Sequence, residues 1–433
     1  MENEKADQLV QDRGILSDIE MPCDGKQMST SEVGPPPDGG MTAWLQVFLL
    51  HMVFFNTWGV ANSFGVFQEY YSTNLDVSRA SISWIGSAQV FFLFSIGVTT
   101  GRLTDAGHFK IIFAFGVALQ VVGIFMVSLC TAYWQIFLSQ AVCLGLGNGC
   151  TFCPALSVMS SYFKKKRAFA VGLAAAGAGT GGLVYPVVAN QLLYHHNVGF
   201  PWTLRAMGFI MLATYMPCLV WFRPRLPPHV AESWLDTSAF RELPFIFYSI
   251  SMFFNFWGLY FAFFYLGTFA RDELAVAEPI NVLIALNGVG IVGRIAPGII
   301  ADRWTGLLNI LIPLCLIASM LIYCWHAIHS ESALYIFAGI YGLAAAAIQS
   351  VFPAASTTMT PDIKRTGTRV GMIFTIVSFA ALTGPAITGT LIETCHGDYL
   401  GAQIFAGSSI FLGAGFAGCT RLAKTGFRLK VKI

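Results

Sequence analysis

Charged side chains are scarce in this chain of 433 residues. Asp, Glu, Lys and Arg together make up 11% of the sequence, whereas soluble globular proteins carry about 25%. Hydrophobic residues reach 55%, which is more apolar surface than a soluble domain can bury. The composition therefore excludes a soluble globular domain, and a net charge of only +2 gives no reason to expect a nucleic-acid partner.

Several other signals are missing. Residues 1 to 37 are polar and acidic and lack the order of a cleavable signal peptide, so we expect a disordered cytosolic tail. No G-x-x-x-x-G-K-[ST] loop occurs, which argues against ATP as the direct energy source. The ten cysteines are scattered, and Cys150 and Cys153 lie in an apolar run, where we expect packing rather than redox or metal chemistry. We therefore predict no cofactor and no metal.

The sequence does contain a series of apolar runs about twenty residues long. Each is long enough to cross a hydrocarbon core of about 30 Å as a helix, and lipid offers the backbone of other structures no hydrogen-bond partners. We therefore predict an all-α membrane protein with twelve transmembrane helices in two pseudo-symmetric bundles of six. The expected spans are residues 44–68, 80–101, 110–130, 133–157, 168–193, 203–222, 244–269, 280–300, 307–328, 332–357, 369–393 and 401–422.

Basic residues predict the orientation of these spans. With both termini in the cytosol, 21 of the 25 Lys and Arg residues are cytosolic, three are outside (Arg79, Arg205 and Arg271), and Arg294 lies within a span. Such a bias is typical of cytosolic loops. The predicted division is a tail over 1–41, a bundle over 42–222, a cytosolic loop over 223–243, a bundle over 244–422 and a tail over 423–433.

An internal repeat indicates that the two bundles arose by duplication. The sequence Phe54–Gly59 in span one returns as Phe253–Gly258 in span seven, at an offset of 199 residues. The same offset relates Gly172 to Gly371 and Pro186 to Pro385. Parallel repeats of this kind place a substrate site near the midplane between the halves, where rocking exposes it to each side in turn.

A short motif recurs after spans two and eight. It reads Gly101-x-x-x-Asp105 in the first half, and Gly298-x-x-x-Asp302 followed by Arg303 in the second. Glycine permits close helix approach, and an Asp at a helix start meets its positive dipole end. We interpret these five residues as gating elements; a plain tight turn is the alternative.

Arg294 is the strongest candidate for a substrate-binding residue. A basic side chain at the centre of a spanning helix costs about 2.5 to 3.5 kcal/mol, and such a cost usually marks a functional site. Its planar guanidinium suits a carboxylate. The alternatives are that Arg294 extends toward the cytosol or pairs with Asp302.

Most of the remaining polar groups within the spans are neutral. His51 is the one titratable group deep in span one, and a lone His in such a place is more often a hydrogen-bonded packing residue than a functional one. Since no Asp or Glu lies mid-span, His51, Glu69, Asp302 and Glu393 are the candidates for carrying a proton, and proton coupling stays open. The full predicted substrate-binding set is His51, Asn56, Asn62, Asn255, Trp257, Asn287, Arg294 and Gln349.

Two motifs resemble the monocarboxylate-porter family of the major facilitator superfamily, in its fungal form. Asp38–Trp44, with the sequence DGGMTAW, is similar to the family's start of span one, and Tyr162–Gly172 is similar to its start of span five. In the family's animal lactate carriers, a Lys in span one and an Asp four residues before an Arg in span eight couple a proton to a carboxylate. Arg294 falls on that Arg, but Asn62 and Gly290 stand at the other two positions.

The resemblance implies a transporter for a small organic anion or a weakly charged metabolite, rather than a lactate carrier. We favour efflux of a secondary metabolite, with uptake of a monocarboxylate or vitamin-like nutrient as the alternative. A transporter-like nutrient sensor is a different class, and an enzyme is not expected. The predicted partners are a small-molecule substrate and the lipid bilayer, for a monomer in the plasma membrane.

Overall fold

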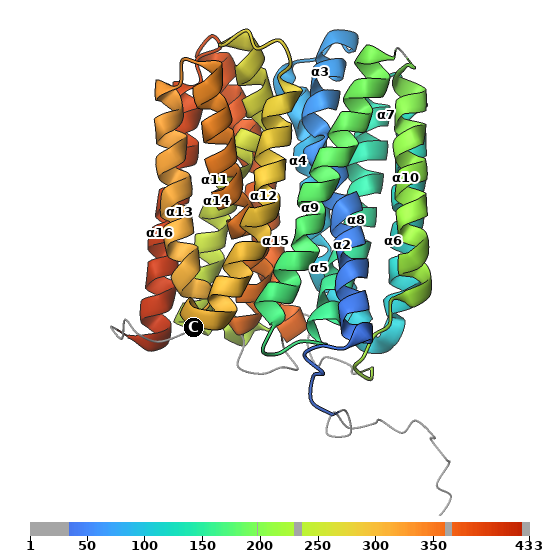
Figure 1. Cartoon of the computed structure of the whole chain (residues 1–433), viewed down its shortest axis with the longest axis vertical. Coiled ribbons are helices and arrows are strands. Elements are labelled where there is room, and N and C mark those ends of the chain that lie inside the picture. Colours follow the sequence, from blue (N-terminus) through green and yellow to red (C-terminus); the bar gives the residue numbers. More distant parts are fainter. Residues whose placement is uncertain (1–33, 197, 229–235, 360–365, 427–433) are drawn as a thin grey trace, which may run out of the picture. The chain divides into compact units, whose positions relative to one another are not determined.

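Each long apolar run of the sequence folds into a helix (Figure 1). The computed structural model describes residues 34–196, 198–228, 236–359 and 366–426. Within these residues there is no β-strand, and eleven continuous helical stretches are long and apolar enough to cross a membrane. One stretch, Ser81–Val127, is 47 residues long and contains Gly107, whose φ of 90° breaks the helix. It therefore supplies two crossings, and the described residues contain the twelve predicted spans.

The helices follow the predicted spans closely, with two of the spans broken by kinks. In chain order they are α2 (Met41–Asn62), α3 (Phe64–Asn74), α4 (Arg79–Ser95), α5 (Gly97–Leu103), α6 (Phe109–Val127), α7 (Tyr133–Ile136), α8 (Gly145–Ser160), α9 (Arg167–Asn190), α10 (Phe200–Trp221), α11 (Leu243–Asp272), α12 (Ile280–Ile300), α13 (Leu307–Cys324), α14 (Glu331–Thr358), α15 (Thr366–Thr394) and α16 (Leu400–Thr425). Short π-helical segments at Thr104–His108, Phe137–Leu144, Gln191–His195 and Ala301–Thr305 continue several of them, and 3-10 turns lie at Thr237–Arg241 and Trp325–Ala327.

Span one differs most from its prediction. It continues to Asn74 instead of ending at residue 68, and it is divided at Ser63. The Ser63 hydroxyl donates a hydrogen bond to the carbonyl oxygen of Val60 at 2.6 Å, which competes with the helical ladder at that turn. The last helix, α16, likewise reaches Thr425, three residues beyond the predicted end of the last span at residue 422.

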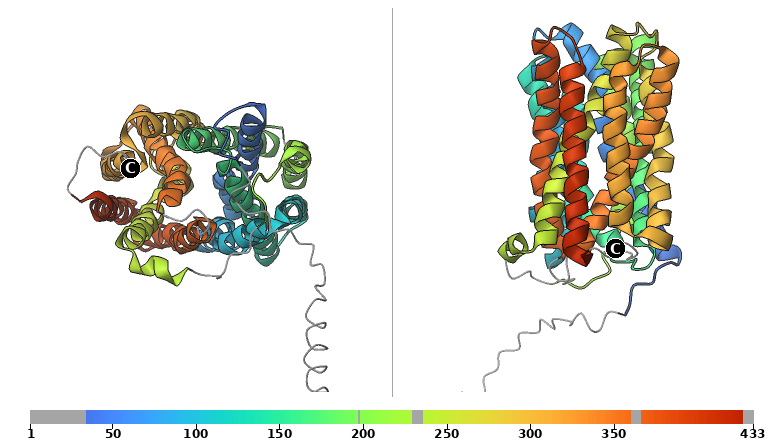
Figure 2. Two further views of the ribbon diagram at one scale, coloured as in Figure 1. Left: turned by 90° about the horizontal axis from the view of Figure 1, so that it is seen from below. Right: turned by 90° about the vertical axis from the view of Figure 1, so that its left-hand side faces the viewer.

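The helices from Pro35 onward form one compact unit, and within it they lie in two groups, one from each half of the sequence (Figure 2). Seen from below in Figure 2, the blue-to-green helices of the N-terminal half lie on one side and the yellow-to-red helices of the C-terminal half on the other. The halves meet where α9 packs on α12 and where α15 packs on α4 and α5. Spans five and eight thus pair as spans eleven and two do, which is the exchange that the sequence repeat predicts.

Glycines make both of these interfaces close. A Cβ atom on Gly172 of α9 would lie 2.5 Å from the carbonyl oxygen of Arg294 in α12. A Cβ atom on Gly371 of α15 would lie 2.8 Å from the Cα of Val98 in α5. Because neither distance admits a side chain, the two glycines that the 199-residue offset relates serve the same packing role in the two interfaces.

The two ends of the bundle are named here by the chain ends they hold. The proximal end holds Met41 of α2 and Thr425 of α16, at the bottom of Figure 1, and the distal end is opposite. At the proximal end the segment between the halves is fixed to α15. The buried guanidinium of Arg369 donates to Asp236 at 2.8 Å and to both carboxylate oxygens of Glu242 at 2.7 and 2.8 Å.

Candidate substrate and gating sites

Arg294 lies on the buried side of α12, where it contacts α14. Arg294 is 1% exposed, and its Nη2 donates a hydrogen bond to Oε1 of Gln349 at 3.1 Å. Among the described residues, Nη1 has no hydrogen-bond partner. A buried charged donor without a partner is costly, so this nitrogen is the place where a ligand oxygen would be most stabilising.

Space beside Nη1 is kept open by glycine. A Cβ atom on Gly290, one turn earlier on α12, would lie 2.9 Å from Nη1, and one on Gly179 of α9 would lie 3.4 Å away. Gly290 is the position where the resemblance expects an Asp. An Asp at position 290 would therefore lie next to the guanidinium. This chain has Gly290 there and no side chain.

Two small cavities lie between the halves around this point. Arg294 and Gln349 line the first, here called the Arg294 cavity, together with Phe54, Trp58, Phe152 and Phe352. The second, the Tyr260 cavity, is lined by Trp58, Asn62, Val90, Tyr260, Phe263 and Phe264. Their free volumes are about 20 and 10 Å³, room for about one water molecule each. A substrate can enter only if the halves separate.

Aromatic rings from both halves fill the space around the cavities. The Trp58 ring of α2 stacks on the Tyr260 ring of α11, with centroids 6.1 Å apart and planes 13° from parallel. Phe94 of α4 contacts Phe256 of α11 at 6.0 Å and Phe374 of α15 at 5.4 Å. These contacts join surfaces that must part when either end opens, so a ligand would replace them with its own apolar surface.

An amide pair bridges the halves beside the Tyr260 cavity. Nδ2 of Asn62 in α2 donates to Oδ1 of Asn287 in α12 at 3.1 Å. Gly182 of α9 permits this contact, since its Cβ atom would lie 2.7 Å from Oδ1 of Asn287. Asn62 stands at the position where the resemblance expects a Lys, and the contact here is between neutral groups.

Besides Asn287, four residues of the predicted binding set line neither cavity. Asn56 bonds to Thr214 at 2.9 Å and to Tyr185 at 2.6 Å, and Asn255 bonds to the carbonyl oxygen of Ser251 at 2.8 Å. His51 contacts the carbonyl oxygen of Leu173 and the hydroxyl of Thr180, both at 3.1 Å. The indole of Trp257 donates to Thr383 at 2.9 Å. The structure thus gives these four contacts within their own halves.

The recurring Gly-x-x-x-Asp motifs each contact the opposite half at the proximal end. Oδ2 of Asp302 accepts a hydrogen bond from the backbone NH of Phe169, at the start of α9 in the other half, at 2.8 Å. Asp105 lies against the start of α15, because a Cβ atom on Gly367 would be 2.8 Å from its Oδ2. We expected each Asp at the start of the next helix of its own half. It meets instead the positive end of a helix in the opposite half.

The other residues of these motifs have different surroundings. A Cβ atom on Gly298 would lie 2.6 Å from the carbonyl oxygen of Ala168, so this glycine allows α12 to reach the start of α9. Around Gly101 the packing is looser, with the carbonyl oxygen of Gly367 4.0 Å from such an atom. Arg303 is exposed and lies over the ring of Trp304 at 5.8 Å.

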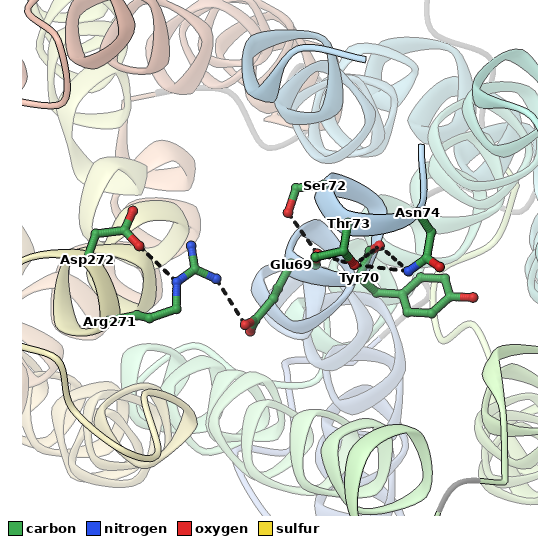
Figure 3. A network of polar contacts seen from close by, with 7 residues as sticks. All are labelled: Glu69, Tyr70, Ser72, Thr73, Asn74, Arg271 and Asp272. Atoms are coloured by element: carbon green, nitrogen blue, oxygen red, sulfur yellow. Dashed lines mark hydrogen bonds and ion pairs between the residues drawn. The ribbon is translucent and has the colours of Figure 1, made fainter. Parts of the chain in front are cut away.

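An ion pair joins the halves at the distal end (Figure 3). Nη1 of Arg271, on α11, lies 2.9 Å from Oε1 of Glu69, on α3, and Nε lies 2.8 Å from Oδ1 of Asp272. The side chains of Arg271 and Glu69 are 36% and 43% exposed, so water screens them. The hydrogen bond between Ser83 and Tyr265 at 3.0 Å is a second contact between the halves.

Reversing one charge of the distal pair should change the initial transport rate by about two- to fivefold, because a partly exposed ion pair is worth about 0.2 to 1 kcal/mol. We expect this for Arg271→Glu, which leaves three carboxylates together. The double variant Glu69→Arg with Arg271→Glu should return the rate to within about twofold of the wild type. Additive losses in the double variant, measured as initial rates at low salt, would show that the pair does not act as a latch.

The two motifs that carry the family resemblance meet at the proximal end. Oδ1 of Asp38 accepts hydrogen bonds from the backbone NH groups of residues 164–166 at 2.6 to 3.4 Å. Burial raises the pKa of Asp38, but these hydrogen bonds and the charge of Lys165 outweigh it and hold the pKa below its usual value. Trp44 packs its ring 5.2 Å from Phe163 and 5.9 Å from Phe169. The two motifs, Asp38–Trp44 and Tyr162–Gly172, therefore hold the start of span one against the start of α9, and we call them the clasp motifs.

Sequence reasoning missed the phenylalanines of the site. With 37 Phe residues in the chain, nothing in the sequence separates a ring that lines a cavity from one that faces lipid. Tyr260 is 3% exposed in the structure and lines a cavity as well.

Known proteins that this sequence resembles are described as transporters or efflux proteins. The sequence pattern of the Major Facilitator Superfamily matches residues 48–385. An MFS-type transporter of Gibberella zeae is 44% identical over 390 residues, covering 89% of this chain and 88% of the relative. The aspyridones efflux protein of Emericella nidulans is 35% identical and covers 88% of this chain and 78% of its own. The agnestins efflux protein of Paecilomyces divaricatus is 33% identical, and the match covers 95% of this chain and 96% of that protein.

Among solved structures, the human organic anion transporter MFSD10 is similar, with a TM-score of 0.66 at 12% sequence identity. The match covers 87% of this chain and 98% of that one. At such low identity the likeness shows the fold alone. Together, the matched sequence pattern, the curated relatives and the twelve-helix arrangement show that the chain belongs to the Major Facilitator Superfamily.

Proposed function

We propose that the chain exports a small organic acid or weakly charged metabolite across the membrane by alternating access. The observation that carries the proposal is the unpaired Nη1 of Arg294, buried among aromatic rings between two halves that close at both ends. Relatives named as efflux proteins for aspyridones and agnestins support the direction of transport. The clasp motifs and Arg294 support the monocarboxylate-porter family as the branch.

The contacts at the two ends supply the alternation. Opening the proximal end requires Asp302 to release the start of α9 and Asp105 to leave the start of α15. Opening the distal end requires the Glu69–Arg271 pair to separate. A substrate acid would bind Arg294 while the proximal end is open, and the aromatic contacts would re-form around it before the distal end opens.

Export of an aromatic acid tests the proposal directly. Yeast cells that express the chain and are preloaded with 2-naphthoate should lose it several times faster than cells with an empty vector. A chain carrying Tyr341→Phe, which removes a buried hydroxyl bonded to Leu259, is the expression-matched control and should export normally. Identical loss from vector cells and wild-type cells, for 2-naphthoate and its hydroxylated analogues alike, would refute the proposal.

We place the chain in the plasma membrane with both termini in the cytosol, and a native cysteine tests this orientation. Cys395 is exposed at the distal end, directly after α15. A membrane-impermeant maleimide should label it in intact cells, and replacing both Cys395 and Cys324, which is also exposed where α13 ends, by Ser should remove that label. Labelling that requires permeabilised cells would reverse the orientation.

A further inference from the structure

The Tyr260 hydroxyl is a second unpaired polar group at the site. Tyr260 is 3% exposed, and within the described part of the chain its hydroxyl has no hydrogen-bond partner. Buried tyrosine hydroxyls in this structure otherwise find partners; that of Tyr341 bonds to Leu259 at 2.8 Å. A buried hydroxyl that lines a cavity and lacks a partner is available to a ligand.

Tyr260 and Arg294 are near neighbours around one ring. Trp58 lines both of their cavities. The unpaired hydroxyl and the unpaired Nη1 therefore flank a single aromatic wall. A ligand that satisfied both would carry an acidic oxygen and a second oxygen on one rigid frame.

The stacking of Trp58 on Tyr260 indicates the shape of that frame. The two rings come from different halves, so they move apart whenever the halves separate. A flat ring inserted between them needs about 7 to 8 Å, since carbon atoms in contact lie about 3.5 to 4 Å apart. The centroids are now 6.1 Å apart and the planes are nearly parallel, so a ring can enter between them only after the two halves have moved apart.

We propose that Trp58 and Tyr260 select planar aromatic acids that carry a second oxygen, with the ring stacked between them, the acid on Arg294 and the second oxygen bonded to the Tyr260 hydroxyl. The inference rests on the proposed function, because it names the substrate class of the same site. A saturated acid of equal size gains no stacking, and an acid without the second oxygen leaves the hydroxyl unpaired.

Binding to the full chain in lipid nanodiscs, measured by calorimetry, tests the role of Tyr260. The probes are 2-naphthoate and its 3-hydroxy and 6-hydroxy derivatives. At least one hydroxy acid should bind about ten times more tightly than 2-naphthoate to the wild type. Tyr260→Phe should remove that preference and leave 2-naphthoate binding within about twofold. Tyr341→Phe is the matched control and should keep the preference.

A second comparison tests the ring. The wild type should bind 2-naphthoate at least about fivefold more tightly than decahydro-2-naphthoate, and Trp58→Leu should abolish the difference. If naphthoate binding depends on Arg294 but Tyr260→Phe keeps the hydroxy-acid preference, this inference fails and the proposed function stands. If the wild type binds no naphthoate, or Arg294→Gln binds all three probes unchanged, both fail.

Discussion

Replacing Arg294 by Gln should reduce export of 2-naphthoate by about a hundredfold. Removing one partner of a buried charge pair costs about 2 to 5 kcal/mol, and each 1.4 kcal/mol is a factor of ten. Arg294 is buried, and among the described residues its guanidinium donates a hydrogen bond to the neutral side chain of Gln349. The amide of Gln keeps polarity and part of the length but cannot neutralise a carboxylate.

Two comparisons separate recognition from structural damage. Arg294→Lys keeps the charge but loses the planar fork, so its export rate should fall between those of the wild type and Arg294→Gln. The methyl ester of 2-naphthoic acid lacks the charge and should be handled equally by the wild type and Arg294→Gln. Equal loss of acid and ester transport would make Arg294 a structural residue, and full export in Arg294→Gln would remove it from the site.

Neutralising Asp302 should slow export by about three- to thirtyfold with surface expression near normal. The carboxylate of Asp302 accepts the backbone NH of Phe169 across the halves, and capping and dipole contacts of this kind are worth about 0.5 to 2 kcal/mol. Asp302→Asn can still accept the hydrogen bond but loses the charge. The proximal end would then close less firmly, and the cycle would be biased toward the proximally open state.

Asp105→Asn should have an effect of similar size, because Asp105 lies against the start of α15 as Asp302 does against α9. Asp398→Asn is the matched control, since Oδ1 of Asp398 accepts a hydrogen bond from the backbone NH of Leu400 at 2.9 Å, at the start of α16 in its own half and at the distal end. Initial export rates normalised to surface protein give the measurement. Wild-type rates in both Asp105→Asn and Asp302→Asn, or an equal loss in Asp398→Asn, would reduce these motifs to packing.

The sequence made Arg294 a candidate binding residue but did not predict which residues lie around it. Asn56 and Trp58 are two residues apart on α2, about 200° around the helix, so they point to opposite sides. Trp58 lines both cavities, while Asn56 bonds to Thr214 inside the N-terminal half. Polar character alone made Asn56 a candidate, and only the rotation of the helix excludes it from the cavities.

The repeat likewise predicts position better than role. Asn56 and Asn255 are related by the 199-residue offset, and both are buried with contacts inside their own halves. Trp58 and Trp257 share the offset too, yet Trp58 lines the cavities while Trp257 bonds to Thr383. The two halves therefore use the repeated tryptophan differently.

The sequence by itself determined that the chain is an all-α membrane protein with twelve spans, where those spans lie, and that its halves repeat. It could do so because transfer of apolar runs into lipid depends on local composition, and the backbone then has no alternative to helix. Only the tertiary structure decided which helices meet, that Asp302 caps a helix of the other half, and that Trp58 and Tyr260 stack beside Arg294. Those facts depend on helix rotation and on close approach at residues such as Gly172, which are set by packing between segments far apart in the sequence.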